Sequence, residues 1–141
     1  MLTVGTAQEL RDAGLQWLPA AFDLFTIALP ELDTQVFVVS EMTILAETLH
    51  GHPALTFHGS VEWALDHVWT GDALWIPRED QLRALIEARM ATEPGWQLAL
   101  EVDSSGYRCQ LRHSQDSETF TAQDASECLA AALLHLLNTA R

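Results

Sequence analysis

The chain has 141 residues and a mass of 15.7 kDa, which is long enough to bury a hydrophobic core without a metal or a disulfide. Its 20 acidic and seven basic residues, all seven of them arginines, give a formal net charge of −13, and this charge repels the phosphates of nucleic acid. A hydrophobic content of 48% excludes wholesale disorder. We therefore expect one folded domain over residues 1–141 that has a protein as its partner and binds no nucleic acid.

The cysteines and the N-terminal residues bear on the cellular compartment. Cys109 and Cys128 are the two cysteines, and residues 1–14 lack the basic and apolar regions of a signal peptide. No apolar run approaches the roughly 18 residues of a membrane span, because the run from Ala20 to Leu32 is interrupted by a charge and a proline. The expected protein is cytoplasmic, with reduced and buried cysteines and no membrane segment.

The first third of the chain predicts one helix and then two strands. Thr6 and Glu9 form a capping box that predicts a helix over about Ala7–Ala13. Apolar residues alternate with smaller ones from Phe25 to Leu29, which is the period of a strand. Gln35–Ser40 is continuous and rich in β-branched residues, which predicts a strand that is buried on both faces.

Residues 59–90 hold three of the five tryptophans and predict two helices separated by a turn. Ser60 is a suitable N-cap for a helix that runs through Val68, because its hydroxyl can accept from the first free backbone N–H groups. The chain turns at Thr70–Asp72, and an apolar stripe over Leu82–Met90 predicts the second helix.

Trp63 falls on the polar side of the first of these helices. Tryptophan among acidic residues is typical of a contact site for a basic partner, because the indole offers a large rigid surface and a face for Arg or Lys. The alternative is that another segment covers Trp63 and makes it part of the core. The candidate binding residues are Glu62, Trp63, Asp66 and Asp72.

The C-terminal third predicts a hairpin, a short strand and a long helix. Trp96–Val102 alternates between apolar and other residues, Asp103–Gly106 has the composition of a turn, and Tyr107, Cys109 and Leu111 then line one face of the return strand. A third strand is expected near Thr119–Phe120.

The last helix is expected over about Ala122–Thr139, with Thr121 and Asp124 as its capping box. Leu134 and Leu137 project outside the apolar stripe of this helix. Either another part of the chain covers them, or they form an exposed flank that a partner or a second copy covers in a homodimer.

Strands and helices are segregated along the chain, which favours an α+β fold. We expect a mainly antiparallel sheet with about four helices, the long C-terminal helix being packed on the sheet.

Four segments resemble a group of short uncharacterised bacterial proteins that often carry the label "pilus assembly protein". These segments are Asp33–Thr43, Glu62–Asp66, Leu74–Leu82 and Ala132–Leu137. The resemblance implies an accessory role in pilus assembly, although the chain lacks the G-x-x-x-x-G-K-[ST] loop of the pilus-associated ATPases. The spacing of residues 43–49 fits either a helix or a strand. The resembling proteins carry more β-branched residues there, which favours a hairpin of Thr43–Leu49 and Ala54–His58.

The sequence holds no catalytic or cofactor signature. His50, His52 and His58 cluster around the expected hairpin, but His-x-His at a turn is weakly specific for zinc, so we expect surface histidines and neither a metal nor a cofactor. Two functions from different classes remain open. One is a small acidic interaction or regulatory module, and the other is a small enzyme or ligand-binding domain with a pocket near the tryptophans.

Overall fold

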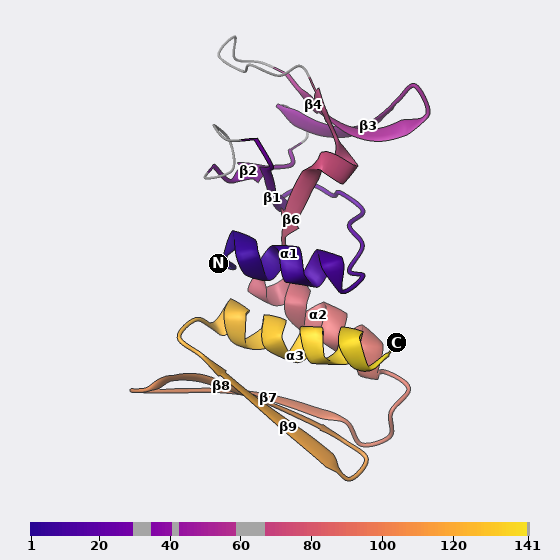
Figure 1. Cartoon of the computed structure of the whole chain (residues 1–141). Coiled ribbons are helices and arrows are strands. Elements are labelled where there is room, and N and C mark those ends of the chain that lie inside the picture. Colours follow the sequence, from indigo (N-terminus) through magenta and orange to yellow (C-terminus); the bar gives the residue numbers. More distant parts are fainter. Residues whose placement is uncertain (30–34, 41–42, 59–66, 141) are drawn as a thin grey trace. The chain divides into compact units, whose positions relative to one another are not determined.

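The computed structural model describes residues 1–29, 35–40, 43–58 and 67–140. The chain divides into two compact units: residues 1–15 with 77–141, and residues 16–76. The second unit is therefore inserted into the sequence of the first (Figure 1). That residues 1–141 fold as a single domain stays a prediction.

The first unit contains three helices and one three-stranded sheet. Its helices are α1 (Val4–Asp12), α2 (Glu79–Met90) and α3 (Ala125–Thr139), and its strands are β7 (Gln97–Asp103), β8 (Gly106–His113) and β9 (Asp116–Ala122). The sheet is antiparallel, in the order β7-β8-β9.

Helix α3 is the central layer of the first unit. It contacts β8 and β9 of the sheet, and it also contacts α1 and α2 (Figure 1). Because two layers cover α3, its buried residues extend around more than one face, including Cys128, Leu133 and Leu137. The sequence alternative in which the chain itself covers a second side of this helix is confirmed for Leu137, while Leu134 is half-buried.

The second unit is built from two three-stranded antiparallel sheets. One sheet has the order β2-β1-β6 and the other the order β3-β4-β5. The strands are β1 (Leu24–Ile27), β2 (Phe37–Val38), β3 (Ile44–Leu49), β4 (His52–Phe57), β5 (His67–Trp69) and β6 (Ala73–Ile76), with a short 3-10 turn, η1 (Thr70–Asp72), before β6.

Apolar residues from both of these sheets form one buried cluster. Phe25 and Phe37 stack at a centroid distance of 5.4 Å, and Leu55 is buried in the same cluster. Trp17 packs against the cluster, stacks on Trp75 at 6.3 Å and donates its Nε1–H to the buried carboxylate of Asp23 at 2.9 Å. The loop before β1 is thus anchored at Asp23, which also accepts from the backbone N–H of Ala20 at 3.0 Å.

Several sequence predictions are confirmed. The α+β class and the packing of the C-terminal helix on an antiparallel sheet are found, although the described residues form three α-helices rather than about four. In the ambiguous segment over residues 43–49, Ile44–Leu49 is a strand, and its hairpin turn at His50 and Gly51 has positive φ at both positions, as a type I′ turn requires. The helix after Pro77 and the β7–β8 hairpin are also confirmed.

Other predictions are wrong at identifiable positions. Helix α1 begins at Val4 because Thr3, rather than Thr6, accepts the capping hydrogen bond from the backbone. His67 and Val68 are not helical but pair with β4, so cross-strand pairing overrides their helical periodicity. Of the strand expected over residues 35–40, only Phe37–Val38 is regular, and Val38 is exposed.

Candidate binding surface

The sheet of the first unit leaves part of its helix-side face uncovered. Cys109 and Leu111 of β8 are buried on this face. Their cross-strand partners on β7 are Leu100 and Leu98, and Val102 pairs with Tyr107, so these three β7 side chains lie on the same face. Yet Leu100 is 38% and Val102 64% exposed, because α3 contacts β8 and β9.

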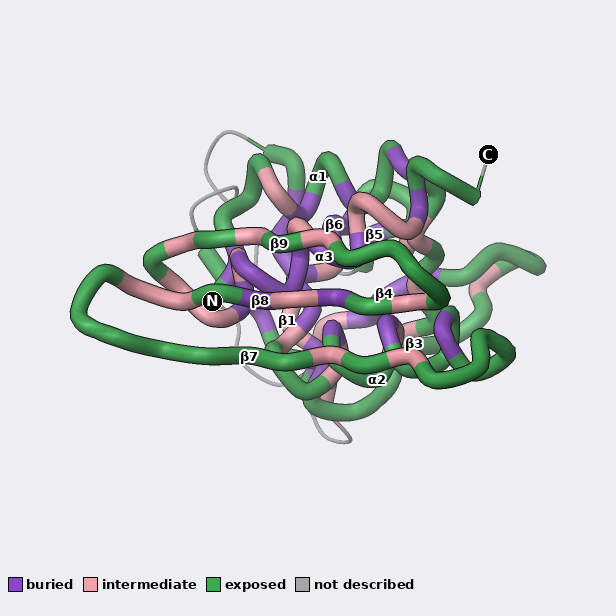
Figure 2. The backbone as a smooth tube through the Cα atoms, turned by 90° about the horizontal axis from the view of Figure 1, so that it is seen from below, coloured by how far each residue is buried: buried purple, intermediate pink, exposed green. Residues whose placement is uncertain are grey.

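Figure 2 shows the result as a nearly continuous exposed run along β7, next to β8, most of which is buried or intermediate. We call Leu98, Leu100 and Val102 the edge row. The edge row is an apolar stripe on the edge strand of an acidic chain.

The edge row also carries the free hydrogen-bonding groups of β7. This strand pairs with β8 on one side and ends the described sheet on the other. The hairpin closes at Asp103 and Gly106, so Asp103 points its backbone groups toward β8, and the direction alternates along the strand. The N–H and C=O groups of the edge row therefore point away from the sheet.

The sequence of β7 lacks most of the features that block pairing with another strand. Natural edge strands are protected by proline, by lysine, by bulges or by being very short. The segment Gln97–Asp103 has seven residues, contains neither proline nor lysine, and pairs with β8 in unbroken register. Its edge is therefore competent to accept a further strand.

The opposite face of the sheet is polar. We call Gln97, Ala99, Glu101 and Asp103 of β7 the outer row, because they alternate with the edge row. Arg108 of β8 donates from Nη2 to Oε2 of Glu101, and this hydrogen bond raises the pKa of Arg108. A shallow pocket of about 200 Å³ lies on this face and is lined by Ala99, Glu101, Arg108, Gln110 and Thr119.

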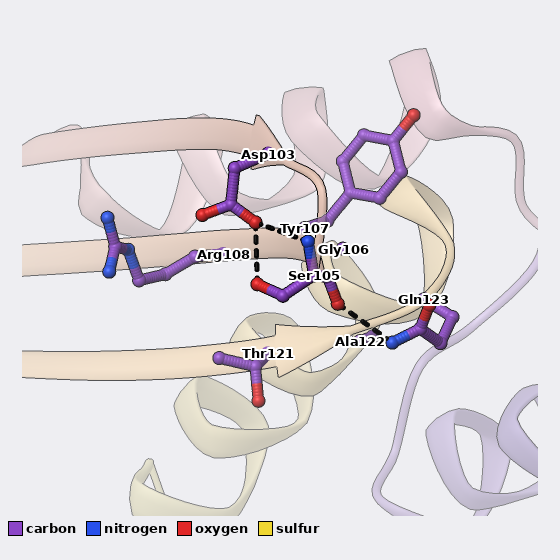
Figure 3. Close-up of a pocket in the computed structure, with 8 residues that line it drawn as sticks. All are labelled: Asp103, Ser105, Gly106, Tyr107, Arg108, Thr121, Ala122 and Gln123. Carbon is purple, nitrogen blue, oxygen red and sulfur yellow. Dashed lines mark hydrogen bonds between the residues drawn. The ribbon is translucent and has the colours of Figure 1, made fainter.

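A larger pocket of about 420 Å³ lies at the β7–β8 turn, and we call it the turn pocket (Figure 3). Asp103 Oδ1 accepts from the hydroxyl of Ser105 at 2.6 Å and from its backbone N–H at 2.8 Å. These hydrogen bonds lower the pKa of Asp103, so its carboxylate stays charged. Gln123 Nε2 donates to the carbonyl oxygen of Ser105 at 3.0 Å and ties the turn to the segment that leads into α3.

The linings of these two pockets hold carboxylate, guanidinium, hydroxyl and amide groups. Neither lining contains a histidine, a cysteine or a tryptophan. These groups can bind a polar or charged side chain by hydrogen bonds and ion pairs, and the linings supply no activated nucleophile.

The residues predicted as a binding site from sequence are not brought together by described contacts. Glu62, Trp63 and Asp66 lie outside the described residues, and Asp72 is exposed on η1. Leu137 is only 6% exposed, so it offers little area to a second copy. Association through Leu134 and Leu137 stays a prediction.

The histidines and cysteines are the residues that a metal site or a reactive thiol would use. No group of three or more His, Cys, Asp or Glu side chains among the described residues is placed to hold a metal ion. His50 occupies a hairpin turn with positive φ. Cys109 and Cys128 are free and buried, and burial raises the pKa of both thiols.

The sequence predicts β7 as a strand, but it did not lead us to expect a candidate binding surface there. The available signal was the alternation of Leu98, Leu100 and Val102 in a strand without proline or lysine. Which strand of the hairpin α3 covers depends on tertiary packing, and no pattern within β7 reveals it.

No protein-family model matches the chain, and neither a curated protein nor a solved structure matches it. Among the described residues, no helix has both the length and the apolar character that crossing a membrane requires.

Proposed function

We propose that this chain is a protein-interaction module that binds an extended segment of a partner protein along β7. The observation that carries the proposal is the edge row, whose backbone groups point away from the sheet and whose Leu100 and Val102 side chains are exposed. A partner strand would satisfy the backbone groups and bury the side chains in one step, which is the β-strand addition mode of peptide recognition.

Both parts of such a contact have a physical basis. Backbone hydrogen bonds along an edge supply affinity, and alternate side chains supply specificity. Burial of apolar surface contributes about 25 cal/mol per Å², and Val102 is the most exposed member of the edge row. A partner residue opposite Leu100 or Val102 would cover surface that α3 leaves open.

The charge of the chain favours a different protein over a second copy as the occupant. Two copies that each carry a net charge of −13 repel one another, and this repulsion weakens as salt screens it. A cytoplasmic interaction or regulatory module with a separate partner fits these observations.

The test begins with a phage-displayed library of random peptides selected on the purified chain. Leu100→Pro removes an N–H that points away from β8, so the β7–β8 ladder keeps its hydrogen bonds. We expect the selected peptides to bind this variant roughly tenfold or more weakly, a loss of about 1.4 kcal/mol or more. The matched control Leu100→Thr keeps the N–H, shortens the apolar side chain and should lose less affinity.

A second measurement separates lost binding from lost folding. In the wild-type chain, hydrogen exchange at the amides of Leu98, Leu100 and Val102 should slow when a selected peptide binds. Peptides that bind Leu100→Pro as tightly as wild type, or that leave these three amides unprotected, would refute strand addition at β7.

A further inference from the structure

The proposed strand addition at β7 sets the chemistry of the partner, and the following inference rests on that function. We infer that the partner segment is a basic β-strand, in which apolar residues alternate with lysine or arginine. Its apolar residues face the edge row, and its basic residues face the outer row.

The outer row has a one-sided charge. It contains two carboxylates, Glu101 and Asp103, and no basic residue. Residues directly opposite each other on paired strands have Cβ atoms about 4.5–5.5 Å apart, which is within reach of long side chains. A strand added at β7 therefore places every second side chain beside this acidic row.

Both carboxylates remain available to a cation. Asp103 is held ionised by its hydrogen bonds from Ser105, which lower its pKa. Glu101 pairs with Arg108, and this guanidinium also has an attractive charge interaction with Asp103. At the turn end of β7, two carboxylates thus share one guanidinium, while Arg112 lies at the other end of the strand, opposite Gln97.

The turn pocket can hold the charged end of a long basic side chain. Figure 3 shows Asp103 and Thr121 on opposite sides of the pocket, with Ser105 between them. The Asp103 carboxylate and the Ser105 and Thr121 hydroxyls can accept hydrogen bonds from an ammonium or guanidinium group, which only donates. The Arg108 guanidinium in the same lining is paired with Glu101. At about 420 Å³ the pocket has room for such a group.

The net charge of −13 extends this preference beyond the pocket. A basic segment is drawn toward the chain before contact, so its association rate rises and becomes dependent on salt. An acidic segment of the same shape is repelled.

The experiment uses three synthetic peptides of seven residues, the length of β7. Each alternates valine with one other residue, which is lysine in the first peptide, glutamine in the second and glutamate in the third. Fluorescence anisotropy with the wild-type chain should show the lysine peptide binding roughly tenfold or more tightly than the glutamine peptide. Added salt should reduce this difference, and the glutamate peptide should bind most weakly.

Variants then locate the charge that matters. Asp103→Asn and Glu101→Gln should each weaken binding of the lysine peptide more than binding of the glutamine peptide. Asp116→Asn on β9 is the matched control, because it removes the same charge from the other edge of the sheet. Equal losses in Asp116→Asn and Asp103→Asn would show that net charge alone attracts the peptide, and this would overturn the inference.

The outcomes distinguish this inference from the proposed function. If the glutamine and lysine peptides bind equally well and Leu100→Pro abolishes both, strand addition stands and the basic preference is wrong. If the lysine peptide binds but Leu100→Pro has no effect, the proposed function is wrong. If sedimentation shows a dimer that Leu100→Pro dissociates, β7 belongs to a second copy and the inference fails.

Discussion

At Gly106 the backbone has a φ of +128°, and a Cβ built there would lie 2.9 Å from the carbonyl oxygen of Ala122. Both the φ and the close backbone contact exclude a larger residue without strain. We expect Gly106→Ala to lower the free energy of unfolding by about 1–3 kcal/mol, measured by urea denaturation.

Gly5→Ala is the control for this prediction, because Gly5 lies within α1 and a Cβ there meets no atom closer than 3.9 Å. Alanine favours a helix over glycine by about 0.5–1 kcal/mol, so this variant should be more stable than wild type. Equal stability of Gly106→Ala and wild type would mean that the turn adapts without strain.

Cys109 is a buried thiol whose pKa makes the stability of the fold depend on pH. Burial, and secondly the neighbouring Cys128 thiolate, raise the pKa of Cys109 from 9.0 to about 12. The unfolded chain therefore loses this proton at lower pH than the folded chain, and stability should fall as pH rises from 9.0 toward about 12. Urea midpoints measured across this range should fall less steeply in Cys109→Ala, and thiol reagents should react slowly with native protein.

Among the elements, α3 depends on the side chains at its first turn. Asp124 Oδ1 accepts from the backbone N–H groups of Ser126 and Glu127, at 2.8 and 3.2 Å. Its Oδ2 accepts from the amino group of Met1. Glu127 in turn accepts from Thr3 N and Thr6 Oγ1, both at 2.7 Å, and so joins α1 to α3. One turn of helix thus holds the N-terminal segment.

Asp124→Ala should therefore cost about 0.5–2 kcal/mol of stability, and Asp116→Ala at an exposed strand end should cost less. Partial burial acts to raise the pKa of Asp124, but the hydrogen bonds from Glu127 N and the N-terminus outweigh it and lower the pKa overall. The ionised form is thus favoured in the folded state, so this contribution is present above the unfolded pKa. It should be lost as pH falls through the folded value, measured by unfolding midpoints between acidic and neutral pH.

The elements also show what a single sequence predicts well. Helix α2 and the β7–β8 hairpin follow from apolar periods and turn residues that packing reinforces. The helix expected through Val68 fails because the pairing of Val68 with Leu55 is a contact between distant residues. Helix α3 begins after Asp124 because β9 continues to Ala122 to complete its pairing with β8, and that pairing is also tertiary.

At the scale of the whole molecule, the net charge predicts that the chain does not bind nucleic acid. Seven arginines against twenty acidic residues leave the chain too negative for the counterion release that drives nucleic acid binding. Gel-shift titrations with duplex DNA and single-stranded RNA should show no complex at physiological salt. Salt-sensitive binding in the micromolar range or tighter would mean that a local arginine patch outweighs the net charge.

Sequence determines the candidate site only in part. The charge of Glu101 and Asp103 and the alternation of the edge row can be seen in the sequence. The exposure of Leu100 and Val102 cannot, because it depends on α3 lying over β8 and β9.

The insertion of residues 16–76 between α1 and the rest of its unit has a consequence for biosynthesis. A ribosome finishes every strand of the inserted unit before it reaches α2, and the residues that hold the N-terminal segment, Asp124 and Glu127, emerge later still. During translation, α1 therefore waits without its partners while more than a hundred residues are added. Closure of the first unit is therefore a late event, because α1 is made before the inserted unit and is fixed only after it.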